Sequence, residues 1–267
     1  MKYKAVTPTT EDNWVEGPHG QLFVRIWSPS VANNLAPLIL LHDSLGSVEL
    51  WRSFPSALCQ ATGRQVIAYD RLGFGKSAPH PRKLALDFVA SEAGHDFTAL
   101  IQHLAITRFI VFGHSVGGGM AVNCAARFGE SCVALITESA QAFVEDRTVA
   151  GIEEARELFK DDSQVNRLDK YHGGKARWVL DAWIGSWLHP DFSSWSLMPA
   201  LPNVVSPVLV IHGVEDEYGS PKHPQLIAEL SGASAQLKIM DDTKHVPHKE
   251  KEAEVVRMVS DFLASLP

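Results

Sequence analysis

The residues best suited to chemistry form the pentapeptide Gly-His-Ser-Val-Gly at residues 113–117. An apolar run at residues 108–112 precedes it, and a helix-like stretch at residues 118–128 follows it. A serine between small residues on a sharp strand-to-helix turn has its hydroxyl lifted clear of the backbone. Such a hydroxyl can attack an electrophilic carbon, so Ser115 is the candidate nucleophile.

A serine hydroxyl is a weak nucleophile at neutral pH, and it needs an adjacent base that a third group orients. Residues 208–212 predict a strand, and Asp216 lies on the loop just after it. Residues 237–240 predict a further strand, and His245 lies on the next loop. Because loops at the carboxyl ends of parallel strands meet at one sheet edge, we expect Ser115, Asp216 and His245 to converge there.

Other residues are candidates for two of these roles. His248 is a second possible base, but it follows Pro247 and is expected in the first turn of the closing helix, whereas His245 lies on a free loop. His114 is expected to pack behind the turn that carries the serine. The alternative acids, which lie near the ends of the same strands, are Glu138, Glu215 and Glu217.

The elements that must position these side chains alternate along the chain. Short apolar runs without polar alternation are typical of strands buried on both faces, and the helices between them are typical of crossovers in a parallel sheet. An α/β layered fold follows. The predicted strands are residues 21–27, 37–42, 65–70, 109–114, 132–138, 208–212 and 237–240, and the predicted helices are residues 48–62, 84–104, 116–128, 221–230 and 249–266.

The alternation stops between residues 140 and 207, a stretch far longer than an ordinary connection. It contains a charged helix-like part at residues 152–160 and four of the seven tryptophans, which indicates an inserted unit. Trp183 and Trp187 are four positions apart, so on a helix they would share one face and line an apolar pocket.

Taken together, the motifs resemble the α/β-hydrolase fold family over nearly the whole chain. The resemblance implies an eight-stranded, mostly parallel sheet flanked by helices, with residues 1–139 and 208–267 as the core and residues 140–207 as a helical cap. It also implies Ser115 as nucleophile, Asp216 as orienting acid and His245 as base. The motifs are Leu41-His42 with Gly46, the Asp70–Ser77 segment, Gly-His-Ser-Val-Gly at residues 113–117, Gly213-Val-Glu-Asp216, and His245-Val-Pro.

Acyl transfer also needs backbone donors aimed at the developing oxyanion. The N–H of Val116, directly after the nucleophile, is one expected donor, and the other comes from the loop after the strand at residues 37–42. The family usually has His-Gly there, whereas this chain has His42-Asp43-Ser44. The Ser44 N–H is the preferred second donor, with Leu45 or the Ser44 hydroxyl as alternatives. Asp43 is expected to face away, because its charge would repel an oxyanion.

These inferences predict a serine hydrolase that cleaves a small carboxylic ester, lactone or thioester through an acyl-enzyme. The resemblance also admits hydrolysis of carbon–carbon bonds in diketone-like ring-cleavage products. A ligand-binding member without turnover and a non-hydrolytic lyase are further alternatives. Haloalkane dehalogenation is disfavoured, because those relatives carry an aspartate at the position of Ser115.

Composition and charge argue against several classes of binding partner. A net charge of −7 and a pI near 5.9 argue against binding to nucleic acid or an anionic membrane. No apolar run approaches the roughly 20 residues that span a bilayer, and residues 1–16 lack the apolar core of a secretory signal, which predicts a cytoplasmic protein. No metal-ligand cluster or dinucleotide fingerprint is visible, so neither a metal nor a cofactor is expected. The expected partner is a small-molecule substrate, and the chain could be a monomer or a homo-oligomer.

Overall fold

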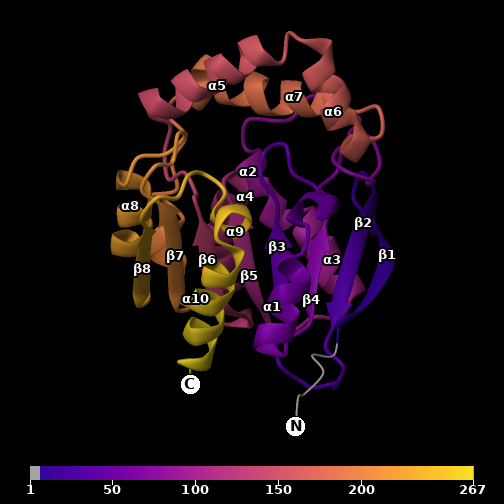
Figure 1. Ribbon diagram of the computed structural model, residues 1–267, viewed down its shortest axis with the longest axis vertical. Coiled ribbons are helices and arrows are strands. Elements are labelled where there is room, and N and C mark those ends of the chain that lie inside the picture. The colour runs from indigo at the N-terminus through magenta and orange to yellow at the C-terminus, as the bar shows by residue number, and fades with distance from the viewer. Residues whose placement is uncertain (1–6, 267) are drawn as a thin grey trace.

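The apolar runs of the sequence form the interior of one twisted sheet (Figure 1). The computed structural model describes residues 7–266. The strands lie in the order β1-β2-β4-β3-β5-β6-β7-β8; β1 with β2 and β2 with β4 are antiparallel, and the remaining pairs are parallel. This confirms the predicted fold class. The strands are β1 (Thr9–Gly17), β2 (Gly20–Ser28), β3 (Leu38–Leu41), β4 (Val66–Tyr69), β5 (Phe109–His114), β6 (Cys132–Glu138), β7 (Val208–Gly213) and β8 (Ala235–Met240).

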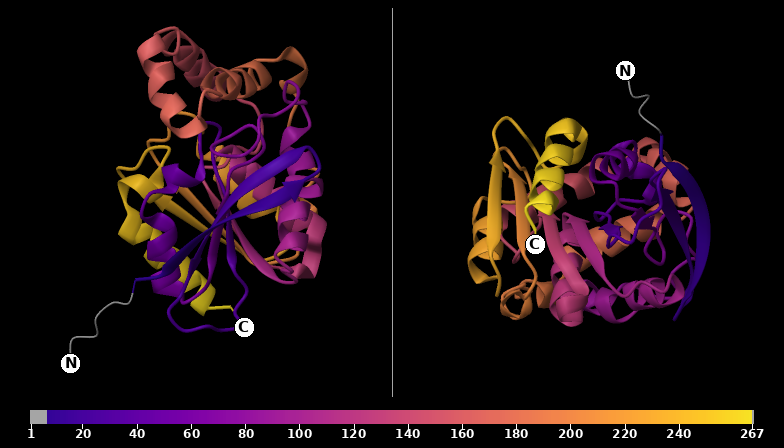
Figure 2. Two further views of the ribbon diagram at one scale, coloured as in Figure 1. Left: turned by 90° about the vertical axis from the view of Figure 1, so that its right-hand side faces the viewer. Right: turned by 90° about the horizontal axis from the view of Figure 1, so that it is seen from below.

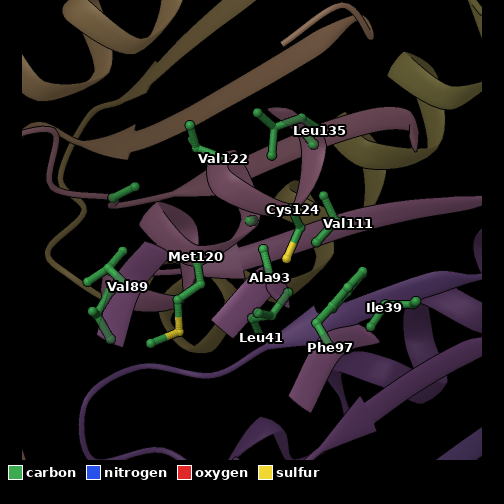
Figure 3. Close-up of a cluster of buried hydrophobic side chains, with 14 of the residues drawn as sticks. Ile39, Leu41, Val89, Ala93, Phe97, Val111, Met120, Val122, Cys124 and Leu135 are labelled. Carbon is green, nitrogen blue, oxygen red and sulfur yellow. The ribbon is translucent and has the colours of Figure 1, made fainter. Parts of the chain in front are cut away.

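Helices cover both faces of the sheet, which explains why β3, β4 and β5 are buried along their whole length (Figure 2). Alternate side chains of a strand point to opposite faces. Leu38 and Leu40 therefore pack with α1 (Phe54–Thr62) and α10 (Glu252–Ala264), on one face. On the opposite face, Ile39 and Leu41 belong to the cluster drawn in Figure 3. That cluster includes residues of α2 (Phe88–Ser91), α3 (Asp96–His103), α4 (Val116–Phe128) and α8 (Lys222–Leu230).

Several elements differ from the sequence prediction. Strand β1 was not predicted, because as an edge strand it is mostly exposed and lacks an apolar run. The helix expected at residues 48–62 is a 3-10 turn (Val48–Trp51) followed by α1, since Arg52 between them has a φ of 55°. The helix expected at residues 84–104 is divided into α2, a 3-10 turn (Glu92–Gly94) and α3. The closing helix likewise consists of α9 (Pro247–Glu250) and α10.

The segment between β6 and β7 lies over the end of the sheet opposite the C-terminal end of α10 (Figure 1). Its helices are α5 (Asp146–Leu158), α6 (Asp162–His172), α7 (Ala176–Leu180), a π-helical turn (Asp181–Gly185) and two 3-10 turns (Pro190–Phe192 and Leu201–Asn203). Phe74, from the loop after β4, is buried among apolar side chains of α6 and α7. The division into a core and a cap at residues 140 and 207 stays a prediction. In residues 7–266, no helix combines the length and the apolar character needed to cross a bilayer.

The Asp70–Ser77 segment is a tight turn, in which Phe74 N donates to the carbonyl of Arg71 at 2.9 Å and Ser77 N to that of Phe74 at 3.0 Å. The carboxylate of Asp70 accepts hydrogen bonds from the backbone N–H groups of Val48, at 2.6 Å, and Lys76, at 2.7 Å. Gly75 has a φ of +47°, and a Cβ there would come within 2.0 Å of the Asp70 carboxylate. The turn therefore requires a glycine, and it presents Phe74 to the overlying helices.

The connection from β5 to α4 leaves no room for a side chain at Gly113. A Cβ on Gly113 would lie 2.0 Å from the carbonyl oxygen of Gly117. We expect Gly113→Ala to lower the free energy of unfolding, measured by urea titration, by at least about 2 kcal/mol because backbone must move. Gly185→Ala is the matched control, since a Cβ there meets nothing within 4 Å. Equal stability of the two variants would contradict this account of the turn.

Candidate active site

Ser115 occupies the sharp turn between β5 and α4, with a φ of 56° and a ψ of −126°. Residues other than glycine rarely adopt a positive φ, and holding one there costs about 1–3 kcal/mol. The backbone N–H of Ser115 donates to the carbonyl of Glu138 at 2.9 Å, which ties the turn to the end of β6. A Cβ on Gly117 would lie 2.2 Å from the carbonyl oxygen of Leu41, so this glycine lets α4 approach β3. The strained turn raises the serine hydroxyl above the sheet edge.

The structure brings Ser115, Asp216 and His245 together at this edge. His245 Nε2 lies 3.0 Å from Ser115 Oγ, and His245 Nδ1 lies 2.9 Å from each carboxylate oxygen of Asp216. Asp216 Oδ1 also accepts hydrogen bonds from the backbone N–H groups of Tyr218, at 2.8 Å, and Gly219, at 3.0 Å. A carboxylate can only accept, so Nδ1 of His245 carries a proton and Nε2 is free to accept one from the serine.

The electrostatic environment suits a base and its ionised partner. Burial opposes protonation of His245, but the hydrogen bond and the charge of Asp216 outweigh it and raise the pKa of the imidazole above its usual 6.5. Burial also opposes ionisation of Asp216, yet its hydrogen bond with His245 and the nearby imidazole charge keep the pKa of this carboxyl below its usual value. Asp216 therefore stays negative at neutral pH.

The alternative base and acid of the sequence analysis pair with each other. His248 Nδ1 lies 2.5 Å from Glu138 Oε2, and the backbone N–H of His248 donates to Glu138 Oε1 at 2.8 Å. His114 Nε2 donates to the carbonyl of His245 at 2.8 Å, so His114 packs behind the turn, as predicted. Of the other acids, Glu215 is exposed, and Glu217 accepts from the backbone N–H of His245 at 3.3 Å.

These buried groups also form a possible metal-ligand set. His114, Glu138 and His248 each offer a ligand atom, and the three atoms lie within 4.8 Å of one another. The sequence did not predict this set, because its members are far apart in the chain. Their hydrogen bonds already use His114 Nε2, His248 Nδ1 and both oxygens of Glu138. A metal would have to replace those bonds, so the donor set fits a hydrogen-bonded network better.

The loop after β3 is held by its own backbone despite the missing glycine. The carbonyl of Asp43 accepts hydrogen bonds from Gly46 N at 3.2 Å, from Arg71 Nη2 at 2.9 Å and from His42 Nδ1 at 2.8 Å. Ser44 and Val116 line the same small hollow beside the serine turn. The structure thus brings together the two residues predicted to supply oxyanion donors, while the choice among Ser44 N–H, Leu45 N–H and the Ser44 hydroxyl stays a prediction.

Asp43 lies near the candidate nucleophile, Ser115. It lines the cavity beside the nucleophile, and a Cβ on Gly46 would come within 2.1 Å of Asp43 Oδ1. Burial disfavours its charged form, but the positive potential of His114 and Lys249 lowers the pKa of its carboxyl to about 2. Asp43 is therefore ionised at neutral pH, and the expectation that its carboxylate faces away from an oxyanion stays a prediction.

A cavity of about 180 Å³ opens above the serine. Trp183 and Trp187 both line it. The amide oxygen of Gln141 lies 3.5 Å from Ser115 Oγ. The sequence analysis missed five lining residues because each lies on a loop or an amphipathic helix whose direction only packing decides. These are Gln141, Thr148, Ile152, Tyr218 and Val246.

The comparison with known families agrees with this geometry. The model of the alpha/beta hydrolase family matches residues 38–258. The chain belongs to this family. The serine hydrolase BPHL of Homo sapiens is 27% identical over 205 residues, which cover 74% of this chain and 69% of that protein. An sn-1-specific diacylglycerol lipase of Danio rerio is 38% identical over 89 residues, 33% of this chain and 26% of the lipase. The matches to the first relatives thus span only about a quarter of their lengths.

Solved structures share the fold of this alpha/beta hydrolase. The proline iminopeptidase of Mycobacterium smegmatis has a TM-score of 0.72 and 24% identity, covering 95% of this chain and 98% of that one. The enol-lactonase of Burkholderia xenovorans LB400 has a TM-score of 0.73 and 18% identity, covering 95% and 100%. These likenesses show the fold.

Replacing Glu138 tests the buried pair behind the serine turn. Burial opposes ionisation of Glu138, but the charge and hydrogen bonds of His248 keep the pKa of its carboxyl below 4.5 in the folded protein. We expect Glu138→Gln to reduce the unfolding free energy by about 3 kcal/mol at pH 7, measured by urea titration. A lowered folded pKa stabilises the protein above the unfolded value, and this stabilisation disappears as the pH falls through the folded value. The difference from wild type should therefore be intact at pH 5 and shrink below pH 4.5.

Glu229→Gln provides the control, because Glu229 is an exposed acid on α8. Its substitution should change stability by less than about 0.5 kcal/mol at every pH. A pH-independent loss in Glu138→Gln would contradict the ion-pair interpretation.

Proposed function

We propose that this chain is a serine hydrolase that cleaves a small carboxylic ester, lactone or thioester through an acyl-enzyme intermediate. The observation that carries the proposal is the continuous hydrogen-bond chain from Ser115 Oγ through His245 to Asp216, beside a cavity of about 180 Å³. Two relatives, a diacylglycerol lipase and an enol-lactonase, are named for ester or lactone substrates, which supports the same bond type here.

In the proposed mechanism, Ser115 Oγ attacks the carbonyl carbon while His245 Nε2 takes the hydroxyl proton. The N–H groups of Val116 and Ser44 stabilise the tetrahedral oxyanion, and each such donor contributes about 3–4 kcal/mol in comparable sites. His245 then gives its proton to the leaving group. A water molecule, deprotonated by His245, cleaves the acyl-enzyme, and the returning proton restores Ser115.

The cavity walls favour a small, uncharged acyl group. Trp183, Trp187 and Ile152 provide apolar surface, and Gln141 provides a polar group close to the nucleophile. Among the described residues that line this cavity, none is a lysine or arginine, whereas Asp43 and Glu217 carry carboxylates. A substrate with its own carboxylate would meet like charge there. This pattern favours neutral esters over acidic ring-cleavage products.

Loss of the serine hydroxyl tests the proposal directly. We expect Ser115→Ala to reduce kcat for p-nitrophenyl butyrate by at least about 10³-fold, because the nucleophile is removed. Ser260→Ala, on α10, should leave turnover unchanged. A fluorophosphonate probe should label wild type and Ser260→Ala but not Ser115→Ala. Labelling of Ser115 without turnover of any ester in a chain-length series would indicate a ligand-binding protein instead.

The pH dependence tests the role of the base. His245 must be neutral to accept the serine proton, so activity is lost as the pH falls through its pKa. Because Asp216 raises that pKa, the acidic limb of kcat/KM should lie above pH 6.5. In Asp216→Asn the limb should move to lower pH, with kcat reduced by about 10⁴-fold. If the acidic limb of kcat/KM in Asp216→Asn lay at the same pH as in wild type, the proposed role of Asp216 would be wrong.

A further inference from the structure

The first turn of α5 is bonded directly to the loop that carries Asp216. Arg147 Nη1 donates to the carbonyl of Asp216 at 3.1 Å. Thr148, which is buried, donates its hydroxyl to the carbonyl of Tyr218 at 2.6 Å. The segment that follows β6 and the loop that follows β7 are therefore joined at two successive points beside the acid.

Glu145, just before α5, extends this attachment further along the same loop. Its carboxylate accepts from Ser220 N at 2.7 Å and Ser220 Oγ at 2.9 Å, and it lies 2.9 Å from His223 Nε2. His223 Nδ1 accepts from the backbone N–H of Ala142 at 3.1 Å, so Nε2 carries the proton and donates to Glu145. Residues 142–148 thus bond the loop at positions 216, 218 and 220, and α8 at position 223.

One peptide group links Thr148 to the carboxylate of Asp216. The carbonyl of Tyr218 and the N–H of Gly219 belong to the same planar peptide, so their positions are not independent. The carbonyl accepts from Thr148, while the N–H donates to Asp216 Oδ1 at 3.0 Å. A shift of Thr148 therefore moves a hydrogen-bond donor of the acid.

Packing reinforces the same connection. A Cβ on Gly151 would lie 3.0 Å from the Tyr218 ring, so α5 rests closely on this tyrosine. The Tyr218 ring centre is 4.9 Å from that of His245. Thr148 and Ile152 of the same helix also line the cavity. Helix α5 therefore lines the cavity and also holds the loop that carries Asp216.

We propose that Arg147 and Thr148 are positioning residues that hold Asp216 in its orientation toward His245. The position of α5 then determines the geometry of Ser115, His245 and Asp216. This inference rests on the proposed hydrolase function. It implies that a substrate displacing α5 changes the base as well as the shape of the cavity. The charged and titratable groups around His245 are Asp216, Asp43, Glu217, His114, His212 and Tyr218.

The first test compares variants that remove or keep each donor. Thr148→Val removes the hydroxyl at constant shape, and Arg147→Ala removes the guanidinium. A lost hydrogen bond of ordinary strength corresponds to a fall in kcat of about three- to tenfold. In both variants kcat should change by a larger factor than KM. The acidic limb of kcat/KM should move to lower pH, because a misoriented Asp216 raises the pKa of His245 less.

Thr148→Ser and Arg147→Lys keep a donor and should restore both kcat and the limb. Arg156→Ala is the matched control, because Arg156 is on α5 but its ion pairs, with Glu153 and Glu157, stay within that helix. An unshifted limb in both Thr148→Val and Arg147→Ala, or a change confined to KM, would overturn the inference. Arg147 does not line the cavity, so its variant separates positioning from substrate contact.

A double-mutant cycle shows whether the effect passes through Asp216. In an Asp216→Asn background, Arg147→Ala should cause no further loss of kcat/KM, whereas an additive loss would overturn the inference. The two proposals fail differently. If Ser115→Ala retained turnover, the proposed function itself would be wrong; if it lost turnover while the Arg147 and Thr148 variants kept the wild-type limb and kcat, only the positioning role would be wrong.

Discussion

The hydrogen bond between Asp216 and His245 is the interaction on which the site depends. It places the proton on Nδ1 and leaves Nε2, which faces Ser115 Oγ at 3.0 Å, able to accept the serine proton. The bond lies at the carboxyl ends of parallel strands, where β5, β7 and β8 all deliver their loops. The fold thus brings residues that are distant in the chain into contact.

Two kinds of constraint keep this contact in place. Close backbone packing leaves no room for a Cβ at Gly113 or Gly117, the glycines on either side of the Ser115 turn. Polar networks hold the rest: Glu138 with His248 behind the serine turn, and the backbone N–H groups of Tyr218 and Gly219 beneath the carboxylate of Asp216. Buried charges of this kind are costly unless they are paired, so each network also restricts the loops that carry it.

The inserted helices do more than close the cavity. Tryptophans of this segment form one wall, while the first turn of α5 bonds to the acid loop from above. The same segment therefore contacts both the cavity and the loop that carries Asp216. Under the proposed mechanism, this arrangement connects substrate shape to the orientation of Asp216.

Local sequence was sufficient for the parts of the protein that depend on short-range constraints. The turn around Ser115 needs small residues on both sides, and the buried strands need continuous apolar runs, so both were predictable from the chain. Strand β1 was missed because an exposed edge strand carries no such run. The places of Asp216 and His245 just after two predicted strands likewise indicated that they would lie near Ser115. Only the tertiary structure decided that His248 pairs with Glu138, and which residues join Trp183 and Trp187 around the cavity. Those choices arise from contacts between residues that are distant in sequence, for which neither residue alone carries a signal.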